Sequence, residues 1–191
     1  MRAFIALEIS DEQKNALDQV ETHLKYAGAD VKWVEKSNIH LTLKFLGEIS
    51  EEKSQEVRNI LDDIARHFKP FEVGANGRSP LQKDIGVFPS MEHPRVIWVG
   101  LDKGAEESKR LAEEIDEQLS KIGFAKEARP FAAHLTIGRV RSPKNKQALK
   151  EKMLSYTLPS IPPTLIQSII LFKSTLTPKG SIYTKIHEAK L

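Results

Sequence analysis

Residues 40–47, HLTLKFLG, and residues 134–140, HLTIGRV, both begin with the pattern His-Leu-Thr-aliphatic. Two such patterns with matching apolar residues are not expected by chance in a chain with only six histidines. Alternate side chains of a β-strand share a face, so His40 would lie beside Thr42 and His134 beside Thr136, with the aliphatic residues facing the interior. The repetition predicts two equivalent strands, each presenting an imidazole next to a hydroxyl group.

The sequence around the two motifs repeats as well. A predicted strand at residues 2–9 is followed by a helix, for which Asp11 offers an N-cap and Gly28 a stop, and then by extended segments at residues 31–34 and 39–47. The same order recurs from residue 95, with a helix ending at Gly123 and a strand at residues 131–140. The separations are 93 residues from Arg2 to Arg95, 95 from Gly28 to Gly123 and 94 from His40 to His134.

This spacing predicts an internal duplication of a strand–helix–strand–strand unit, with copies at approximately 1–94 and 95–191 of one two-lobed domain. Two equivalent lobes related by a pseudo-twofold axis would place the motifs on opposite sides of a central cleft. Further helices are expected near 51–68 and 144–154, and the strand at residues 71–75 has its expected counterpart from residue 166. The proline-rich residues 158–164 predict a rigid loop, and residues 77–86 a connection.

The composition is that of an ordinary globular protein, with 40% hydrophobic and 29% charged residues. The absence of cysteine removes disulfides, thiolate nucleophiles and sulfur-ligated zinc, and we expect a cytoplasmic protein. The formal net charge of +3 is compatible with a polyanionic partner. A group of basic residues that follows the second motif reads either as a solvated helix face or as a phosphate-binding patch: Arg139, Arg141, Lys144, Lys146, Lys150 and Lys152.

The paired motifs favour in-line displacement at phosphorus. Two imidazoles with ordinary pKa values of ~6.5 supply a base for the incoming oxygen and an acid for the leaving oxygen, while Thr42 and Thr136 donate hydrogen bonds to phosphoryl oxygens. This scheme requires no metal and no cofactor. The other histidines lack a threonine two residues later and are interpreted as surface or packing residues: His23, His67, His93 and His187.

Two residues three positions after the motif threonines are further candidates. Arg139 would bind phosphate if a bulge at Gly138 turned it towards the cleft, and would otherwise be a surface residue. Phe45, at the equivalent place in the first copy, would either stack on a nucleobase or belong to the core.

Nearly the whole chain resembles the two-histidine phosphoesterases, specifically the RNA 2′,3′-cyclic phosphodiesterases, which are also called bacterial and archaeal 2′-5′ RNA ligases. The segments that carry the resemblance are MRAFIALEIS, VKWVEKSNIHLTLKFLGEI, GVFPSMEHPRVIWVGL, FAAHLTIGRV and LFKSTLTPKGSIYTKI. Ala133 departs from the pattern, because many relatives carry proline before the second motif histidine.

The resemblance implies an α+β fold with antiparallel sheets around a central cleft and helices outside. It implies hydrolysis of the 2′,3′-cyclic phosphate at an RNA 3′ end to a 2′-phosphate. His40 would then donate a proton to the leaving 3′ oxygen, His134 would activate water and Arg139 would touch phosphate. Ser174 and Tyr183, in the closing pattern, would line the cleft or serve packing.

Other functions stay open at this point. The reverse of the same chemistry would permit 2′-5′ ligation of tRNA half-molecules, and a noncatalytic RNA-end binding module would keep the cleft without turnover. A histidine-ligated metal hydrolase is disfavoured because carboxylates at ligand spacing do not accompany the motifs. We expect RNA ends, tRNA fragments among them, as the partner, no membrane association, and a monomer.

Overall fold

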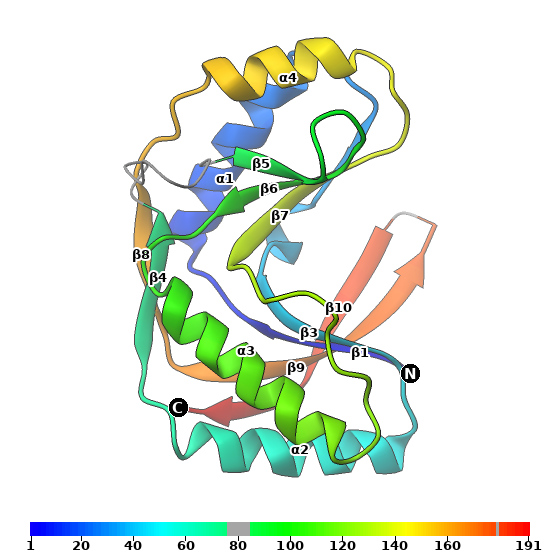
Figure 1. The fold of residues 1–191 in the computed structure, drawn as a ribbon, viewed down its shortest axis with the longest axis vertical. Coiled ribbons are helices and arrows are strands. Elements are labelled where there is room, and N and C mark those ends of the chain that lie inside the picture. Colours follow the sequence, from blue (N-terminus) through cyan, green and yellow to red (C-terminus); the bar gives the residue numbers. More distant parts are fainter. Residues whose placement is uncertain (76–84, 179) are drawn as a thin grey trace.

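The computed structural model describes residues 1–75, 85–178 and 180–191 of the chain (Figure 1). In order, the elements are β1 (Arg2–Leu7), α1 (Asp11–Lys25), β2 (Val31–Trp33), the 3₁₀-helix η1 (Lys36–Asn38), β3 (Leu41–Glu48), α2 (Glu51–Ala65), β4 (Phe71–Ala75), β5 (Ile85–Pro89), β6 (Pro94–Gly100), α3 (Ala105–Ser120), β7 (His134–Val140), α4 (Lys146–Ser155), β8 (Ile161–Ile166), β9 (Ser168–Thr177) and β10 (Gly180–Lys190). Most of the predicted connection at residues 77–86 lies outside the described residues.

The strands form two four-stranded sheets and one two-stranded sheet. Sheet A has the order β10-β9-β1-β3, sheet B has the order β2-β7-β6-β5, and β4 pairs with β8. All of these pairings are antiparallel, as expected. Each sheet contains one motif strand next to the first strand of its half: β3 beside β1 in sheet A, and β7 beside β6 in sheet B.

The two halves exchange elements. β2 belongs to the first half of the chain but pairs with β7 of the second, with Trp33 opposite Gly138. The helices cross over as well, because α1 contacts β7 while α3 contacts β3. In Figure 1, α1 and α4 accordingly lie on the side of sheet B, and α2 and α3 lie on the side of sheet A. The helix that precedes the first motif, α1, therefore covers the second motif strand, β7. The helix that precedes the second motif, α3, covers the first motif strand, β3.

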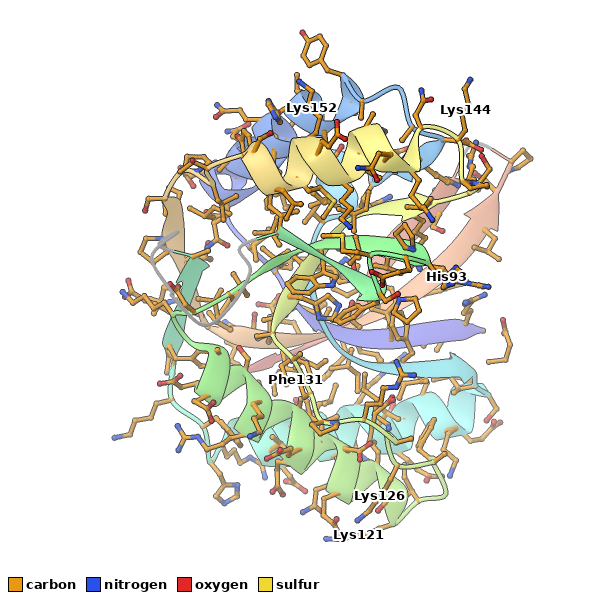
Figure 2. The ribbon with its side chains drawn as sticks, turned by 45° about the horizontal axis from the view of Figure 1, so that its top comes forward. His93, Lys121, Lys126, Phe131, Lys144 and Lys152 are labelled. Atoms are coloured by element: carbon orange, nitrogen blue, oxygen red, sulfur yellow. The ribbon has the colours of Figure 1, made fainter. Side chains whose placement is uncertain are left out.

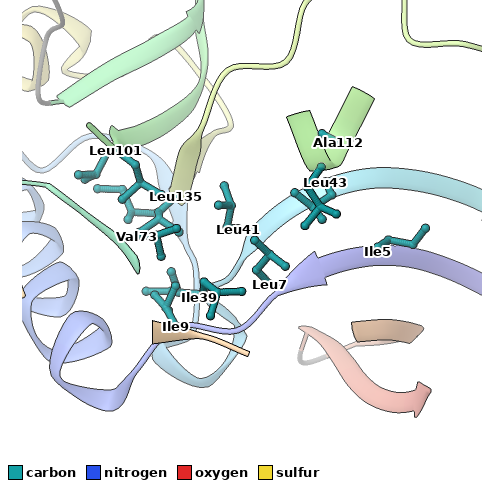
Figure 3. Close-up of a cluster of buried hydrophobic side chains, with 14 of the residues drawn as sticks. Ile5, Leu7, Ile9, Ile39, Leu41, Leu43, Val73, Leu101, Ala112 and Leu135 are labelled. Carbon is teal, nitrogen blue, oxygen red and sulfur yellow. The ribbon is translucent and has the colours of Figure 1, made fainter. Parts of the chain in front are cut away.

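One hydrophobic core joins the halves. Leu41 and Leu135, the leucines of the two motifs, are fully buried members of the same cluster (Figure 3). Val73 and Leu101 lie in it too, and the helices contribute Leu17, Leu61 and Leu111 among others. Burial of apolar side chains stabilises the fold by about 25 cal/mol for each Å² of surface removed from water. This burial anchors both motif strands to a common interior.

Three sequence predictions need correction. The N-cap of α1 is Ser10, whose hydroxyl accepts a hydrogen bond from the Gln13 amide (3.2 Å), and Asp11 is the first helical residue. The described residues between α3 and β7 form no strand, so the second copy lacks a counterpart of β2. The proline-rich segment predicted as a loop at residues 158–164 contains the first four residues of β8 (Ile161–Ile166).

β8 accommodates its two prolines because it has a single neighbour among the described residues. That neighbour is β4, where Thr164 lies opposite Val73 and Ile161 opposite Ala75, with a register shift between them. A proline lacks an amide donor and is tolerated on such an edge or at an irregularity. Among the described residues, no helix is long and apolar enough to cross a membrane.

Candidate active site

His40 lies immediately before β3, and a backbone contact fixes its ring. Its Nδ1 is 2.7 Å from the carbonyl oxygen of Asn38. Because a carbonyl oxygen only accepts, Nδ1 carries the proton and donates it to this bond. The Nε2 atom is therefore the nitrogen that is free to exchange a proton with another molecule.

His134, the first residue of β7, is held in the same way. Its Nδ1 donates to the carbonyl oxygen of Ala132 at 2.6 Å, again two residues earlier in the chain. The two motifs therefore share a ring orientation as well as a sequence pattern. Among the described residues no group bonds to the Nε2 atom of either imidazole, so both are available for general acid–base catalysis.

Aromatic rings surround His40. Phe4 of β1 stacks on it with 4.8 Å between ring centroids, and Tyr183 of β10 meets it edge-on at 5.4 Å. Phe172 of β9 lies 6.1 Å away and itself stacks on Phe4 at 5.2 Å. These rings belong to a small cluster separate from the main core, on the opposite face of sheet A.

His134 has a smaller aromatic surround. Phe88 of β5 meets it edge-on at 5.1 Å, and Trp98 of β6 does so at 6.2 Å. Phe88 and Trp98 also contact each other at 5.1 Å. The tryptophan is held closely against β5, where a side chain at Gly86 would collide with its ring.

Burial sets the charge of both histidines. Loss of solvent lowers the pKa of His40 to about 4; the hydrogen bond to Asn38 opposes the shift, and the positive charges of Lys14 and Arg139 add to it. Burial also lowers the pKa of His134, opposed by its bond to Ala132. In the free protein both rings are neutral at pH 7, so one must gain a proton to serve as an acid.

The motif threonines lie opposite corresponding positions of the neighbouring strands. Thr42 pairs with Ala6 of β1, and Thr136 pairs with Trp98 of β6. Both are half-buried, and neither hydroxyl has a hydrogen-bond partner within the described parts of the chain. These two hydroxyl groups are therefore available to a bound ligand.

Both motif strands contain the same bulge after the threonine. In β7 the register skips Ile137, because Trp98 faces Thr136 while the preceding Ile97 faces Gly138. In β3 it skips Leu43 in the same way, because Ala6 faces Thr42 while Ile5 faces Lys44. Because of the bulge, the two residues that follow each motif threonine are both buried. The third residue after the threonine then lies on the same face of the sheet as the threonine.

That next residue is Arg139 in β7 and Phe45 in β3. Both side chains are exposed, and the bulge at Gly138 on which the placement of Arg139 depended is present. Phe45 is 61% exposed, so it is not a core residue. A Cβ atom at residue 138 would lie 2.8 Å from the side chain of Val31, which explains the glycine there.

Ser174 and Tyr183 lie directly opposite each other on β9 and β10. Tyr183 contacts His40 as described, and both residues are half-buried. A hollow of about 330 Å³ adjoins this region and is lined by His40, Tyr183, Phe172 and Lys14 among others. Ser174 does not line this hollow. Its connection to the site is its strand pairing with Tyr183.

The two halves of the site are connected through β3 and β7, which contact each other. The effect of Arg139 on His40 acts between the sheets, since Arg139 belongs to sheet B and His40 precedes a strand of sheet A. A second hollow, of about 730 Å³, is lined by Arg139, Arg95 and Arg141 among others, and His40 does not line it. His134 lines neither hollow. The described residues include no group of three or more metal-ligating side chains.

Several contact residues were not identified from the sequence. They are Phe4, Phe88, Trp98 and Phe172, which touch the two imidazoles, and Lys14, whose charge acts on His40. Phe4 and Trp98 lie on the strands next to the motif strands, so knowledge of the pairing β1–β3 and β6–β7 would have revealed them. The backbone acceptors of Asn38 and Ala132 have no side-chain signature.

Comparison with known proteins gives a consistent result. A family model described as "LigT like Phosphoesterase" matches residues 7–98 and 99–183, one stretch in each half. The chain is 34% identical over 191 residues to an RNA 2′,3′-cyclic phosphodiesterase of Methanothermobacter thermautotrophicus, covering 100% of this chain and 99% of that protein. It is 39% identical over 188 residues to the protein of the same name from Methanocaldococcus jannaschii, covering 98% and 99% of the two chains.

Solved structures share the fold. A crystal structure of a Thermus thermophilus protein superposes with a TM-score of 0.78 at 27% identity, over 100% of this chain and 98% of the other. That of Escherichia coli LigT complexed with 3′-AMP superposes with a TM-score of 0.76 at 22% identity, over 100% and 97%.

Proposed function

The chain belongs to the LigT-like phosphoesterase family, and on that premise we propose that it is an RNA 2′,3′-cyclic phosphodiesterase, which opens the cyclic phosphate at an RNA 3′ end to a 2′-phosphate. The observation that carries this proposal is the matched pair of imidazoles. Each is anchored through Nδ1 to a backbone carbonyl, and each motif supplies a threonine hydroxyl that no protein group occupies within the described residues.

In the proposed reaction, His134 accepts a proton from water as the water oxygen attacks phosphorus. The bond from phosphorus to the 3′ oxygen breaks, and that oxygen takes a proton from His40. The reaction consumes one water, and the 2′ ester bond remains. Each proton transfer contributes about 10²–10⁴-fold to the rate.

Thr42, Thr136 and Arg139 would stabilise the phosphoryl oxygens. Their hydroxyl and guanidinium groups are donors positioned before the reaction, so they need not reorganise as charge builds up in the transition state. Arg139 adds a full positive charge and a planar donor set that matches phosphate.

Substrate binding explains how His40 becomes an acid. In the free protein the low pKa keeps the ring neutral, but a bound phosphate places a negative charge beside it, which favours the imidazolium form. The phosphate therefore brings about the protonation that its own cleavage needs. The aromatic rings near His40, together with exposed Phe45, offer surfaces on which the terminal base can stack.

We further propose that one chain acts alone in the cytoplasm, on RNA ends that include tRNA fragments. All of the groups named for the reaction come from a single chain, so no second copy is needed to complete the site. Light scattering of the purified protein tests the monomer.

The deciding experiment is incubation with a nucleoside 2′,3′-cyclic phosphate and with a short RNA ending in the same group, followed by identification of the products. We expect a 2′-phosphate, and no turnover by His40→Ala or His134→Ala. His67→Ala is the matched control, because His67 is exposed at the end of α2 and its ring bonds to the Asp63 carbonyl. A 2′-5′ linkage formed from two RNA fragments would instead establish ligation. Binding without turnover by the wild-type protein would establish a noncatalytic RNA-end module.

A further inference from the structure

We propose that the RNA strand on the 5′ side of the reacting end lies in a basic groove along β6 and β7, where its phosphodiester groups are bound. This inference rests on the proposed function and concerns a surface that, apart from Arg139, the proposed reaction does not use. The groove, called here the β6–β7 groove, has a volume of about 730 Å³, and the lining residues used below are His93, Arg95, Val96, Arg139, Arg141 and Lys146.

The β6–β7 groove continues the catalytic face of sheet B. After the bulge in β7, Arg139 lies opposite Val96 on the face that carries Thr136 and Trp98. Arg141 follows two residues later, and its amide still donates to the carbonyl of Asp30 at 2.9 Å, so the backbone remains extended there. From Thr136 to Arg141 an extended chain covers at most roughly 16 Å at about 3.3 Å per residue. A substrate bound at the motif can therefore extend along this path without leaving the sheet.

Two segments that line the groove are joined by a hydrogen bond. Lys146, at the start of α4, donates from Nζ to the carbonyl oxygen of Glu92 at 2.7 Å. This bond ties the turn between β5 and β6 to α4. Figure 2 shows His93 at that turn, on the same side of the molecule as Lys144 near the start of α4.

The charge of the groove fits a row of anions. Arg95, Arg139 and Arg141 are exposed, and none of them forms an ion pair within the described parts of the chain. Glu92 is the acidic residue of the lining, and its carboxylate is fully exposed. Phosphodiester groups keep one negative charge at any physiological pH, and their neutralisation by lysine and arginine releases counterions, which drives binding.

The direction of the RNA follows from its chemistry. A 2′,3′-cyclic phosphate is always the 3′ terminus, so every other phosphate of the strand lies on the 5′ side of the reacting group. The hollow beside His40, of about 330 Å³ and with Phe172 and Tyr183 in a largely polar lining, suits the terminal nucleoside. Arg139, the residue proposed to hold the reacting phosphate, also lines the β6–β7 groove, so this groove would receive the phosphates that precede the reacting one.

The test measures kcat/KM for two substrates, an oligonucleotide and a nucleoside cyclic phosphate, in a groove variant and in a control variant. We expect R95Q/R141Q to lower kcat/KM for a short RNA oligonucleotide with a cyclic phosphate end by roughly tenfold or more at low salt, while kcat/KM for a nucleoside 2′,3′-cyclic phosphate stays unchanged. The slope of log affinity against log salt should become shallower by about 0.7 for each phosphate group that the variant no longer neutralises. R110Q/K121Q removes the same charge from exposed sites on and just after α3, and should leave both substrates unaffected; Lys121 lies at the end of the molecule away from His93 (Figure 2).

Each other result has a distinct meaning. An unchanged oligonucleotide rate in R95Q/R141Q overturns the groove and leaves the proposed function intact. Equal losses on both substrates also overturn it, because the arginines would then act on the catalytic site or on folding, which thermal unfolding distinguishes. If the wild-type protein hydrolyses neither substrate, the proposed function fails, and the groove is judged by fluorescence anisotropy of the oligonucleotide. Weaker binding by R95Q/R141Q than by R110Q/K121Q supports it, and equal binding refutes it.

Discussion

Arg139 and His40 belong to opposite sheets, yet the positive charge of Arg139 acts on the His40 ring. After burial, which is the main cause, this charge and that of Lys14 help to hold the pKa of His40 at about 4. The same arginine thus makes His40 a stronger acid and offers a partner to phosphate. On the proposed function, the two effects would support each other when Arg139 binds the phosphate of the substrate.

The pH dependence of the reaction should follow these pKa values. The free protein is competent when one histidine is protonated and the other is neutral, and both pKa values lie below the ordinary 6.5. As pH rises through the higher of the two, the protonated fraction falls, so we expect kcat/KM to be greatest on the acid side of pH 6.5. Bound phosphate raises the pKa of the donor, so the optimum of kcat should lie at higher pH. Steady-state profiles over both limbs test this, and a kcat/KM maximum above pH 7 would contradict it.

Substitution of Arg139 separates its two effects. Arg139→Gln removes a charged donor to phosphate, worth about 1.5–3 kcal/mol, and should lower kcat/KM by roughly 10- to 150-fold. Loss of the positive charge should also raise the pKa of His40, which NMR titration of the imidazole protons measures. Lys32→Gln is the matched control, because Lys32 lies opposite Arg139 on β2 and is exposed. Similar kinetics for the two variants would remove Arg139 from substrate binding.

The motif threonines should contribute through their hydroxyl groups. Thr42→Val and Thr136→Val keep the shape of the side chain and remove one donor to an anion, which costs about 1–3 kcal/mol of transition-state stabilisation, or roughly 5- to 150-fold in kcat/KM. Thr184→Val, at an exposed position on β10, is the control. If both motif variants retain the wild-type rate with unchanged thermal unfolding, the hydroxyls do not take part.

The proposed chemistry needs only imidazole, hydroxyl and guanidinium groups. We therefore expect kcat and KM to be the same before and after dialysis against EDTA, with metal content measured on the same samples. Loss of turnover that added divalent cation restores would show that the protonation scheme is incomplete.

A buried ion pair should be important for stability. Lys44, next to the bulge in β3, is nearly inaccessible to solvent; its Nζ pairs with Asp116 of α3 and donates to the carbonyl of Ala125 at 2.9 Å. Asp116→Ala leaves a buried ammonium without its main partner and should lower the free energy of unfolding by about 3 kcal/mol.

The control is Asp63→Ala. Asp63 pairs with Arg66 at 2.6 Å, both side chains are about 70% exposed, and the loss should be at most about 1 kcal/mol. Denaturant unfolding measures both variants. A loss for Asp116→Ala no greater than that for Asp63→Ala would mean that water already solvates Lys44.

Much of the fold follows from the sequence because the His-Leu-Thr-aliphatic motif and the strand and helix that precede it recur at matched separations. The matched separations predicted equivalent strands and helices, and the burial of Leu41 and Leu135 followed from the alternation of each motif. The exchange of helices between the halves was not predicted. The spacing of apolar residues shows that one face of α1 is buried, but it does not show whether that face packs on a strand of its own half or of the other half. In the structure α1 contacts β7, which belongs to the other half.

The predictions about the site divide in the same way. Side-chain chemistry identified His40, Thr42, His134 and Thr136 as candidates, and the structure assigns them matching backbone environments. Their catalytic roles stay predictions. The aromatic residues around the histidines were not predicted, because Phe4 and Trp98 are far from the motifs in sequence. They come close to the motifs only through the pairing of β1 with β3 and of β6 with β7. Proline is disfavoured in a strand that has neighbours on both sides but is tolerated on an edge strand. The prolines of β8 therefore led to the wrong prediction of a loop.

The twin bulges also bear on the history of the chain. A single extra residue at the same place in both copies is more simply inherited once than acquired twice, so the insertion predates the doubling of the ancestral gene. In that ancestor, two identical subunits would have offered identical groups to a symmetric pocket. Divergence at the position after the bulge, to arginine in one descendant half and phenylalanine in the other, then placed a charge on one motif strand and an aromatic ring on the other. An asymmetric ligand could from that point bind in only one orientation.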